Sequence, residues 1–533
     1  MEEKDLWKAV NQHTGKKSSS AIMSLMARYE SPSIAVNAIN SHLKDIFVPC
    51  DKTSMGVAPN NNFDWSPNVS SENICHILSH LHPHKSSPDI PNVLYRSAAT
   101  FLAPKLSKLF QMSLSSAVVP KIWKSSVITP IPKTRVPCVE DIRPISLISP
   151  IAKTFEKIIL NSLKPTLLSA YGSNQFGFRP KSSTLCALTR LHNRVTDLLD
   201  NASIFGVIII AYDYSKAFDR LRTDLIIKRL TEENFPSKAV LWIANYLSER
   251  SQTVKVGLTE SCPVEVTSGV PQGSILGPYL YSVTTATYKP LNCSDCEVFK
   301  YADDTTLVFP LHKSSRNDHI QREHQHLLNW SMINDLKLNV KKCKAMIIRK
   351  PNVQAGLIYI PNDVVETLQL NLLGVIFNSK CTWSSHIDHV IKKCSRLLFA
   401  FRKIRSYFSS HKLRRLYFSL VRTVIEYCAP LYVGISSSDA LRLSRLQSRF
   451  HRVICGPHCD FNCLPPLELR RSQLTKYFLL KIMDADHILH RELPEISRTG
   501  RFILPPRRTD RRSKSFFLFS CEKYNADFVR SHD

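Results

Sequence analysis

The sequence predicts an α+β fold in which an antiparallel sheet with its helices is followed by an all-helical region. Two observations predict it. Between residues 101 and 377, helical patterns alternate with short β-prone strands. Beyond residue 380 the period changes, and apolar residues recur at helical spacing through 387–404, 413–424 and 443–453.

The chain divides into successive units along its length. With 533 residues, of which 43% are hydrophobic, it is long enough for about two to four structural units. Residues 1–100 combine short helical patterns with a polar, proline-containing stretch, and they predict an extension or linker. We expect the α+β unit at 101–379, the helical unit at 380–460 and a basic C-terminal region at 461–533.

The charge balance indicates a polyanionic partner. Seventy-one Lys and Arg against 44 Asp and Glu give a formal charge of +27, spread along the chain, which favours nucleic acid. No apolar stretch approaches the roughly 18 residues that span a bilayer, and the first residues are too acidic for a signal peptide. We therefore expect no membrane partner. Fifteen cysteines without a secretory signal indicate reduced thiols and an intracellular location, in the cytoplasm, the nucleus or both.

Two adjacent aspartates, Asp303 and Asp304, lie between β-prone stretches at 298–301 and 307–309. The pattern predicts a hairpin with the acidic pair at its tight turn. Neighbouring carboxylates repel each other unless cations neutralise them, and such hard oxygen ligands suit Mg²⁺. For this pair taken alone, a solvated Asp-Asp turn is the alternative, because turns favour Asp.

A third carboxylate, Asp213, follows the hydrophobic run at 206–212. The β-branched residues 207–210 predict a strand buried in a sheet, which delivers Asp213 to a fixed place at the end of the strand. If it faces the turn at Asp303 and Asp304, three carboxylates would hold two Mg²⁺ ions, with Mn²⁺ as an alternative. Two such ions support in-line phosphoryl transfer.

Three sequence strings occur in the order in which a known family has them. They are AYDYSKAFD at 211–219, SGVPQGSILGP at 268–278 and YADD at 301–304. Together they resemble the reverse transcriptases of non-LTR (LINE-type, jockey-like) retrotransposons. The resemblance implies a right-hand polymerase with fingers and palm at 101–379 and a helical thumb at 380–460. It also implies an RNA-directed DNA polymerase, a nucleotidyltransferase that extends a primer 3′-hydroxyl on an RNA template.

The resemblance also assigns residues that bind the incoming nucleotide. Arg143 matches the fingers segment that closes on the nucleotide, and Lys133 lies where the family has another cation. Both would contact the triphosphate. Phe218 matches an aromatic gate whose ring excludes a ribose hydroxyl by steric contact. Gln272 is expected to contact the nucleotide or the template.

Further residues are expected to contact nucleic acid or the leaving group. Gly273 leaves room for a base pair or sugar beside the backbone, and Arg179 is a candidate phosphate contact on the template side. Lys342 matches a lysine near the leaving pyrophosphate, where it would donate a proton; a basic loop is the alternative. A stripe of arginines in the thumb either tracks phosphates or forms a solvated face. It consists of Arg442, Arg445, Arg449 and Arg452.

The expected partners are an RNA template, a DNA or RNA primer and deoxynucleoside triphosphates, and an element ribonucleoprotein is a further candidate. Autonomous elements of this type carry an endonuclease upstream of the polymerase, and we expect this chain to lack that domain. A domesticated or inactive element product that only binds RNA is the alternative function. Group II intron maturases and telomerase are the alternative classes, and the three strings fit the LINE-type family better.

Overall fold

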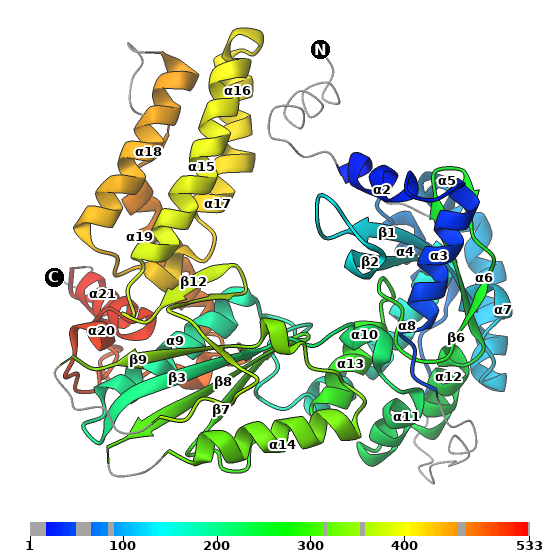
Figure 1. Cartoon of the computed structure of the whole chain (residues 1–533), viewed down its shortest axis with the longest axis horizontal. Coiled ribbons are helices and arrows are strands. Elements are labelled where there is room, and N and C mark those ends of the chain that lie inside the picture. The colour runs from blue at the N-terminus through cyan, green and yellow to red at the C-terminus, as the bar shows by residue number, and fades with distance from the viewer. Residues whose placement is uncertain are drawn as a thin grey trace.

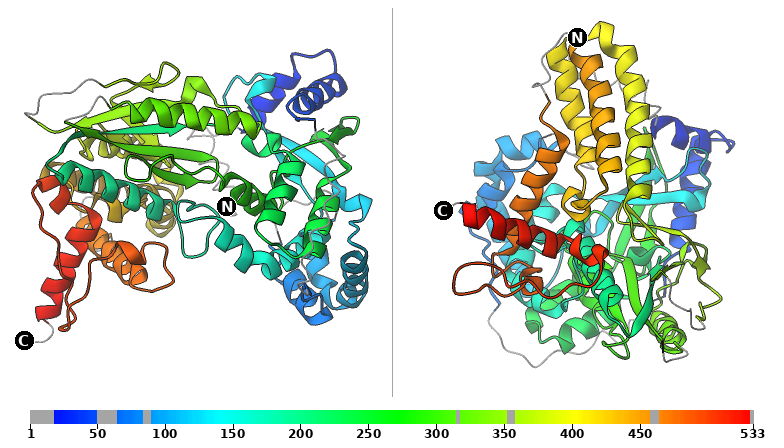
Figure 2. Two further views of the ribbon diagram at one scale, coloured as in Figure 1. Left: turned by 90° about the horizontal axis from the view of Figure 1, so that it is seen from below. Right: turned by 90° about the vertical axis from the view of Figure 1, so that its left-hand side faces the viewer.

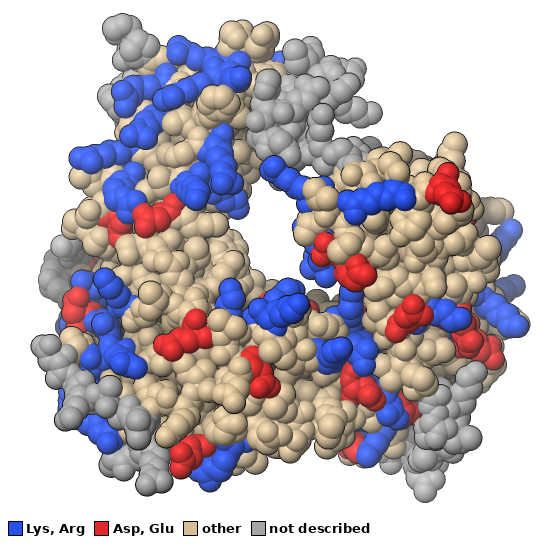
Figure 3. All heavy atoms as spheres, viewed as in Figure 1, with Lys and Arg blue, Asp and Glu red and all other residues tan. Residues whose placement is uncertain are grey.

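The computed structural model describes residues 18–49, 65–83, 90–313, 317–351, 358–456 and 464–530. Three masses surround a central opening, which the space-filling view shows as a gap through the molecule (Figures 1 and 3). The right-hand view of Figure 2 shows a group of long helices that stands away from the central sheet.

The first mass is a five-stranded sheet, which we call the palm, with strand order β10-β9-β3-β8-β7. Every neighbouring pair is antiparallel except β9 and β10. This confirms the predicted antiparallel sheet and the predicted strand over 207–210. The strands are β3 (Ile204–Tyr212), β7 (Glu297–Tyr301), β8 (Asp304–His312), β9 (Lys344–Arg349) and β10 (Val365–Glu366).

Helices cover both faces of strand β3. Successive residues of a strand point to opposite faces, so Val207 packs in the cluster that contains α9 (Thr184–Asp200). Its neighbour Ile208 packs in the cluster that contains α14 (His319–Ile333). Burial on both faces explains why this strand is a continuous apolar run rather than an alternating one.

The second mass, the fingers, contains a sheet of order β2-β1-β4-β5, with β6 beside β4. Helix α3 (Pro32–Lys44) packs on this sheet, where Ile39 shares a buried cluster with Val254 and the Asn40 amide donates to the Ser261 hydroxyl at 2.9 Å. The expectation of an extension or linker over 1–100 does not describe α3, because the apolar face of this helix completes the core of the fingers. The strands are β1 (Ser125–Pro132), β2 (Ile142–Leu147), β4 (Arg250–Val256), β5 (Thr259–Glu260) and β6 (Val264–Val266).

Six of the longer helices, together with Trp123 and Ala217 from two short ones, share one core. Its centre is aromatic, with the rings of Phe110 and Phe155 stacked at 4.2 Å and Trp242 edge-on to Phe155 at 5.3 Å. This core anchors the segment 268–278, which runs into α13. The helices are α4 (Ser71–Ser79), α6 (Ala99–Ser116), α8 (Pro150–Ala170), α11 (Thr223–Glu232), α12 (Ser237–Leu247) and α13 (Gly277–Thr285).

The third mass is the all-helical thumb, which follows a hairpin of β11 (Gln369–Leu372) and β12 (Val375–Asn378). The predicted helices are present and their apolar stripes share one buried cluster, in which the rings of Phe401 and Phe450 pack edge-to-face at 5.3 Å. None of the helices within the described ranges is both long and apolar enough to cross a membrane. The thumb helices are α15 (Ser384–Ile404), α16 (Ser410–Leu416), α17 (Thr423–Ile425) and α18 (Ser437–Cys455).

The C-terminal region docks on the palm and the thumb. It contains α19 (Leu467–Ile482), α20 (Asp510–Ser513) and α21 (Phe516–Arg530). The buried Arg512 guanidinium donates to the Asn193 side-chain oxygen at 2.6 Å and pairs with Asp197, both on α9. These contacts tie the end of the chain to the helix under β3, and we keep the boundaries near 101, 380 and 461 as a proposal.

Candidate active site

Strands β7 and β8 form the predicted hairpin. Tyr301 pairs with Asp304, which leaves Ala302 and Asp303 as a two-residue turn. Ala302 has φ 57°, which is the left-handed conformation that such tight hairpin turns require. The Gln175 side chain accepts from the Ala302 N–H at 3.2 Å and thereby holds the turn from outside.

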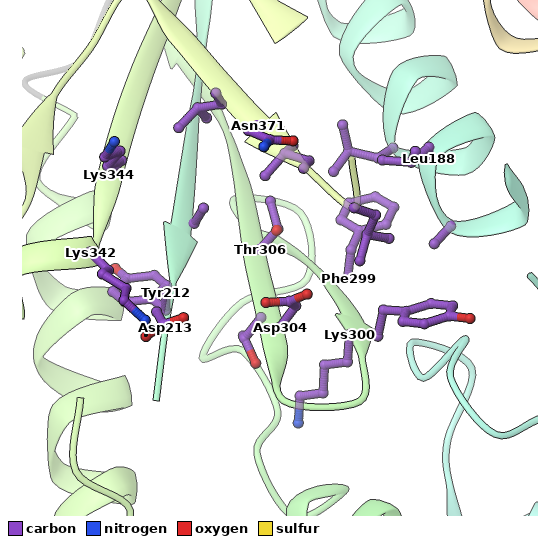
Figure 4. A pocket seen from close by; sticks show the side chains of 18 of the residues that line it. Leu188, Tyr212, Asp213, Phe299, Lys300, Asp304, Thr306, Lys342, Lys344 and Asn371 are labelled. Atoms are coloured by element: carbon purple, nitrogen blue, oxygen red, sulfur yellow. Dashed lines mark hydrogen bonds and ion pairs between the residues drawn. The ribbon is translucent and has the colours of Figure 1, made fainter. Parts of the chain in front are cut away.

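Asp213 lies next to this turn because of the strand register. Tyr212 on β3 pairs with Thr305 on β8, so Asp213 and Asp304 each adjoin a member of this pair, and their charges interact. The backbone of Asp213 is fixed by its carbonyl, which accepts from the Asn339 N–H at 2.7 Å. Figure 4 shows Asp213 and Asp304 at the ends of neighbouring strands.

Burial and mutual charge shape the acidity of the carboxylates. Burial raises the pKa of Asp304 to about 6, and the charges of Asp303 and Asp213 add to this rise. The pKa of Asp303 is raised by burial and then by Asp213, while Arg143 and Lys342 oppose the rise. Adjacent carboxylates whose charged forms are disfavoured in this way are stabilised by a cation.

The site fits a divalent cation in its donor chemistry. All three side chains offer hard oxygen ligands, and the Lys342 ammonium already places a positive charge 3.2 Å from Asp213 Oδ2. In the described part of the chain, no three His, Cys, Asp or Glu side chains group closely enough to form a metal cluster. The three carboxylates therefore lie at the same edge of the sheet, but their side chains are not close enough together to coordinate one metal ion in this conformation.

Lys342 lies beside the carboxylates, where the sequence placed a proton donor to pyrophosphate. Its side chain is 60% exposed, and among the described residues its ammonium pairs with Asp213, which leaves it accessible to a ligand in solvent. A cavity of about 310 Å³ opens next to it, between Asp213, Asp304 and Leu372 of β11 (Figure 4).

The two basic residues that were predicted to contact the triphosphate lie on the β1–β2 hairpin of the fingers. Lys133 and Arg143 are both exposed at the loop end of the β1–β2 hairpin, and the charge of Arg143 reaches Asp303. A further cation, Lys216, was not singled out from the sequence. It has φ 53°, and its ammonium donates to the Ile142 carbonyl at 2.6 Å. Its position three residues after Asp213 is the feature of the sequence from which Lys216 could have been predicted.

Phe218 and Gln272 are held by neighbours within the protein. The Phe218 ring stacks on Tyr281 at 4.5 Å with an interplanar angle of 28° and stays partly exposed. The Gln272 amide donates to both Asp219 oxygens at 2.9 and 2.8 Å. This amide is therefore engaged with Asp219, whose pKa burial raises to about 6.

In the structure, a glycine is required at position 273 by a contact within the protein, whereas from the sequence we expected a base pair or sugar to approach there. Its φ is 138°, and a Cβ there would collide with the Ser146 carbonyl of β2. At Gly269 a Cβ would lie 2.6 Å from the Asp219 carbonyl. The chain itself fills the space beside these glycines, so Gly273 serves the contact between the loop and β2.

Arg179 is also engaged by the protein rather than directed to a template phosphate. Its Nη2 donates to the Gly172 carbonyl at 2.8 Å and to the Leu168 carbonyl at 3.2 Å. These are carbonyls at the end of α8, where a cation stabilises free acceptors of the helix.

The four thumb arginines fall into two groups. Arg442 pairs with Asp388 and, at 3.0 Å, with Asp439. Arg445, Arg449 and Arg452 are exposed on α18. Lys and Arg side chains gather over the thumb in the space-filling view (Figure 3).

Part of the chain is similar to known reverse transcriptases. Residues 131–377 match the family described as reverse transcriptase (RNA-dependent DNA polymerase). The chain is 29% identical to a probable RNA-directed DNA polymerase from transposon BS of Drosophila melanogaster, over 70% of this chain and 43% of that protein. It is 28% identical to the RNA-directed DNA polymerase from mobile element jockey of the same organism, over 66% of this chain and 40% of that protein.

The chain thus spans about two fifths of the length of these curated relatives. A solved structure of telomerase from Candida tropicalis with a telomeric RNA fragment is 12% identical, with a TM-score of 0.38 over 74% of this chain and 68% of that chain. The named relatives are RNA-directed DNA polymerases of mobile elements, and residues 131–377 of this chain match the reverse transcriptase family.

Proposed function

We propose that this chain is an RNA-directed DNA polymerase that extends a primer 3′-hydroxyl on an RNA template. The observation that carries the proposal is the strand register, which brings Asp213 and Asp304 to the ends of neighbouring strands, with Asp303 in the adjoining turn. The site lies within the reverse transcriptase segment, and the relatives are named RNA-directed DNA polymerases.

In this proposal Asp213, Asp303 and Asp304 hold two Mg²⁺ ions, with Mn²⁺ as an alternative. When bound, such ions supply Lewis-acid chemistry toward the primer hydroxyl and the phosphates. The protein residues orient the reactants, and Lys342 beside Asp213 offers a proton or a positive charge to the leaving pyrophosphate.

The remaining site residues select and align the nucleotide. Lys133, Arg143 and Lys216 form a cationic side of the site that offsets triphosphate charge. Phe218 stands against the sugar and excludes a ribose hydroxyl. Gln272, held on Asp219, fixes the loop that receives the nucleotide. The exposed thumb arginines contact phosphates of the template and primer.

The partners we propose are an RNA template, a DNA or RNA primer and deoxynucleoside triphosphates, with assembly into an element ribonucleoprotein. We also propose an intracellular location, in the cytoplasm, the nucleus or both. The formal charge of +27 supports a nucleic-acid partner over a neutral one.

Primer extension tests the proposal. The purified chain with a primed RNA template, deoxynucleotides and Mg²⁺ should extend the primer, and Asp303→Asn should abolish extension while RNA binding persists. Asp318→Asn is the matched control, because this exposed aspartate precedes α14 and lies outside the hairpin turn. Binding without extension by the unmodified chain would contradict the proposal and favour an inactive RNA-binding product.

A further inference from the structure

A second hollow lies where the palm, the thumb and the C-terminal region meet. Its volume is about 550 Å³, and it opens between α9, the beginnings of α15 and α18, and the short helix α20. It is separate from the cavity beside Asp213, although α9 lines both of them. Its lining includes His192, Lys380, Trp383, Ser436, Arg511 and Lys514.

The lining carries an excess of unpaired positive charge. Its two acids are already engaged, since Asp439 pairs with Arg442 at 3.0 Å and Asp510 pairs with Lys514 at 2.6 Å. Within the described ranges, Lys380 and Arg511 make no ion pair with any carboxylate. An ammonium and a guanidinium therefore face the same hollow without a counter-charge.

His192 adds a buried donor without a partner. Its side chain lines the hollow at 5% exposure and packs against the Trp383 ring at 5.0 Å. In the described part of the chain its ring makes no hydrogen bond. Burial lowers the pKa of His192 to about 4, so near pH 7 the ring is neutral and keeps one N–H donor. A ligand oxygen in the hollow can accept a hydrogen bond from this N–H.

The first turn of α15 supplies backbone donors to the same space. Trp383 and Ser384, at the beginning of this 21-residue helix, line the hollow, and no side chain caps the helix. The N–H groups of a first helical turn lack partners in the helix and favour an anion. At α18, by contrast, Ser436 already accepts from the Asp439 N–H at 3.1 Å.

From these contacts we propose that the hollow binds a phosphate group, held by Lys380, Arg511, the His192 N–H and the first turn of α15. The phosphate can belong to a phosphodiester of bound nucleic acid or to free phosphate or pyrophosphate. Since α9, α15 and α20 all contribute, the bound group ties the palm, the thumb and the C-terminal region together. The proposal does not depend on polymerase activity.

Lysine footprinting tests it on the full chain. Acetylation of Lys380, followed by mass spectrometry, should slow several-fold in saturating inorganic phosphate. The exposed Lys121 and Lys238 serve as internal controls in the same sample. Arg511→Met should abolish the protection of Lys380, whereas Lys238→Met should leave it intact. His192→Phe should weaken it, with a circular dichroism melt to verify folding.

Two kinds of ligand distinguish the sources of the phosphate. Protection by inorganic phosphate and pyrophosphate indicates a free ligand. Protection only by a single-stranded RNA without terminal phosphates, again lost in Arg511→Met, indicates a phosphodiester. The proposal is overturned if neither ligand protects Lys380 more than Lys121, or if Arg511→Met keeps full protection.

Discussion

At the scale of single residues, the carboxylates of the hairpin turn determine how the site responds to pH. Burial and neighbouring charge place the pKa of Asp304 at about 6, above the ordinary value of 3.8. The charged form of this group is thus disfavoured in the folded chain. A divalent cation and a proton compete for it, because each neutralises the same charge.

We expect primer extension at limiting Mg²⁺ to fall as the pH drops through about 6. The carboxylate is charged above its pKa, and at pH 5 only about a tenth of it remains ionised. Rate measurements from pH 5 to pH 8 check this, and saturating Mg²⁺ should move the midpoint to lower pH. A rate that stays constant down to pH 5 at limiting Mg²⁺ would speak against Asp304 as a ligand.

Phe218 offers a test of sugar selection by a single ring. Because Tyr281 supports this ring at 4.5 Å, Phe218→Val should open space against the sugar without moving the neighbouring backbone. We expect discrimination between deoxynucleotides and ribonucleotides, taken as the ratio of kcat/KM, to fall by about tenfold or more. Incorporation of deoxynucleotides by the same variant is the control. If the variant discriminates between deoxynucleotides and ribonucleotides as well as the unmodified chain, Phe218 does not act as the gate.

At the scale of elements, the loop at 268–278 is fixed by contacts to distant segments. The buried Glu156 of α8 accepts from the Ile275 N–H at 2.6 Å and from the Tyr246 hydroxyl at 2.9 Å. The Gln272 carbonyl accepts from the Ser146 N–H of β2 at 2.8 Å. The loop therefore connects the fingers sheet to the helical core. Its geometry depends on β2, which contacts the loop at Gln272, and on α8, which contacts it at Ile275.

Gly273→Ala should disturb this connection. The added Cβ would meet the Ser146 carbonyl at a φ of 138°, and we expect a loss of about 1–3 kcal/mol in the free energy of unfolding, together with a higher KM for the nucleotide. Gly257→Ala is the matched control, since its φ is also positive at 62° but nothing lies within 4 Å of its Cβ. Urea unfolding and extension kinetics measure both effects. Equal losses in the two variants would contradict the account of this loop.

Local patterns predicted most of the elements that carry the site. The hairpin at Asp303 and Asp304 and the strand before Asp213 follow from short runs of β-prone residues, and the thumb helices follow from their apolar period. Arg179 and Gly273 were assigned to nucleic acid because their segments match the family. Their actual partners, the carbonyls of Gly172 and Ser146, are set by tertiary contacts that no local pattern encodes. The role of α3 in the fingers was missed for the same reason.

At the scale of the whole molecule, the charge is arranged around an opening between thumb and fingers (Figure 3). The fingers offer Lys133 and Arg143, while α18 of the thumb offers its exposed arginines. The C-terminal region braces this arrangement through Arg512 of α20, whose guanidinium donates to Asn193 of α9. Nucleic acid that enters the opening would meet positive charge on both sides.

The thumb arginines should differ in their effect on binding. Arg445→Gln, Arg449→Gln and Arg452→Gln should each weaken binding of a primed RNA template and lower its salt dependence by about 0.7–0.9 per lost phosphate contact. Arg442→Gln should change the salt dependence less, because Asp388 and Asp439 already pair with this guanidinium. Affinities measured at several KCl concentrations decide this. The same change in all four variants, or in none, would contradict the division of the stripe.

Binding of Mn²⁺, followed by electron paramagnetic resonance, tests the central claim most directly. The account predicts that the unmodified chain with a primed RNA template and a non-hydrolysable deoxynucleotide analogue binds Mn²⁺ tightly. It also predicts that Asp213→Asn and Asp304→Asn each lose this binding, while Asp318→Asn retains it. Tight Mn²⁺ binding that survives both of the first two substitutions would show that these carboxylates do not share a cation site.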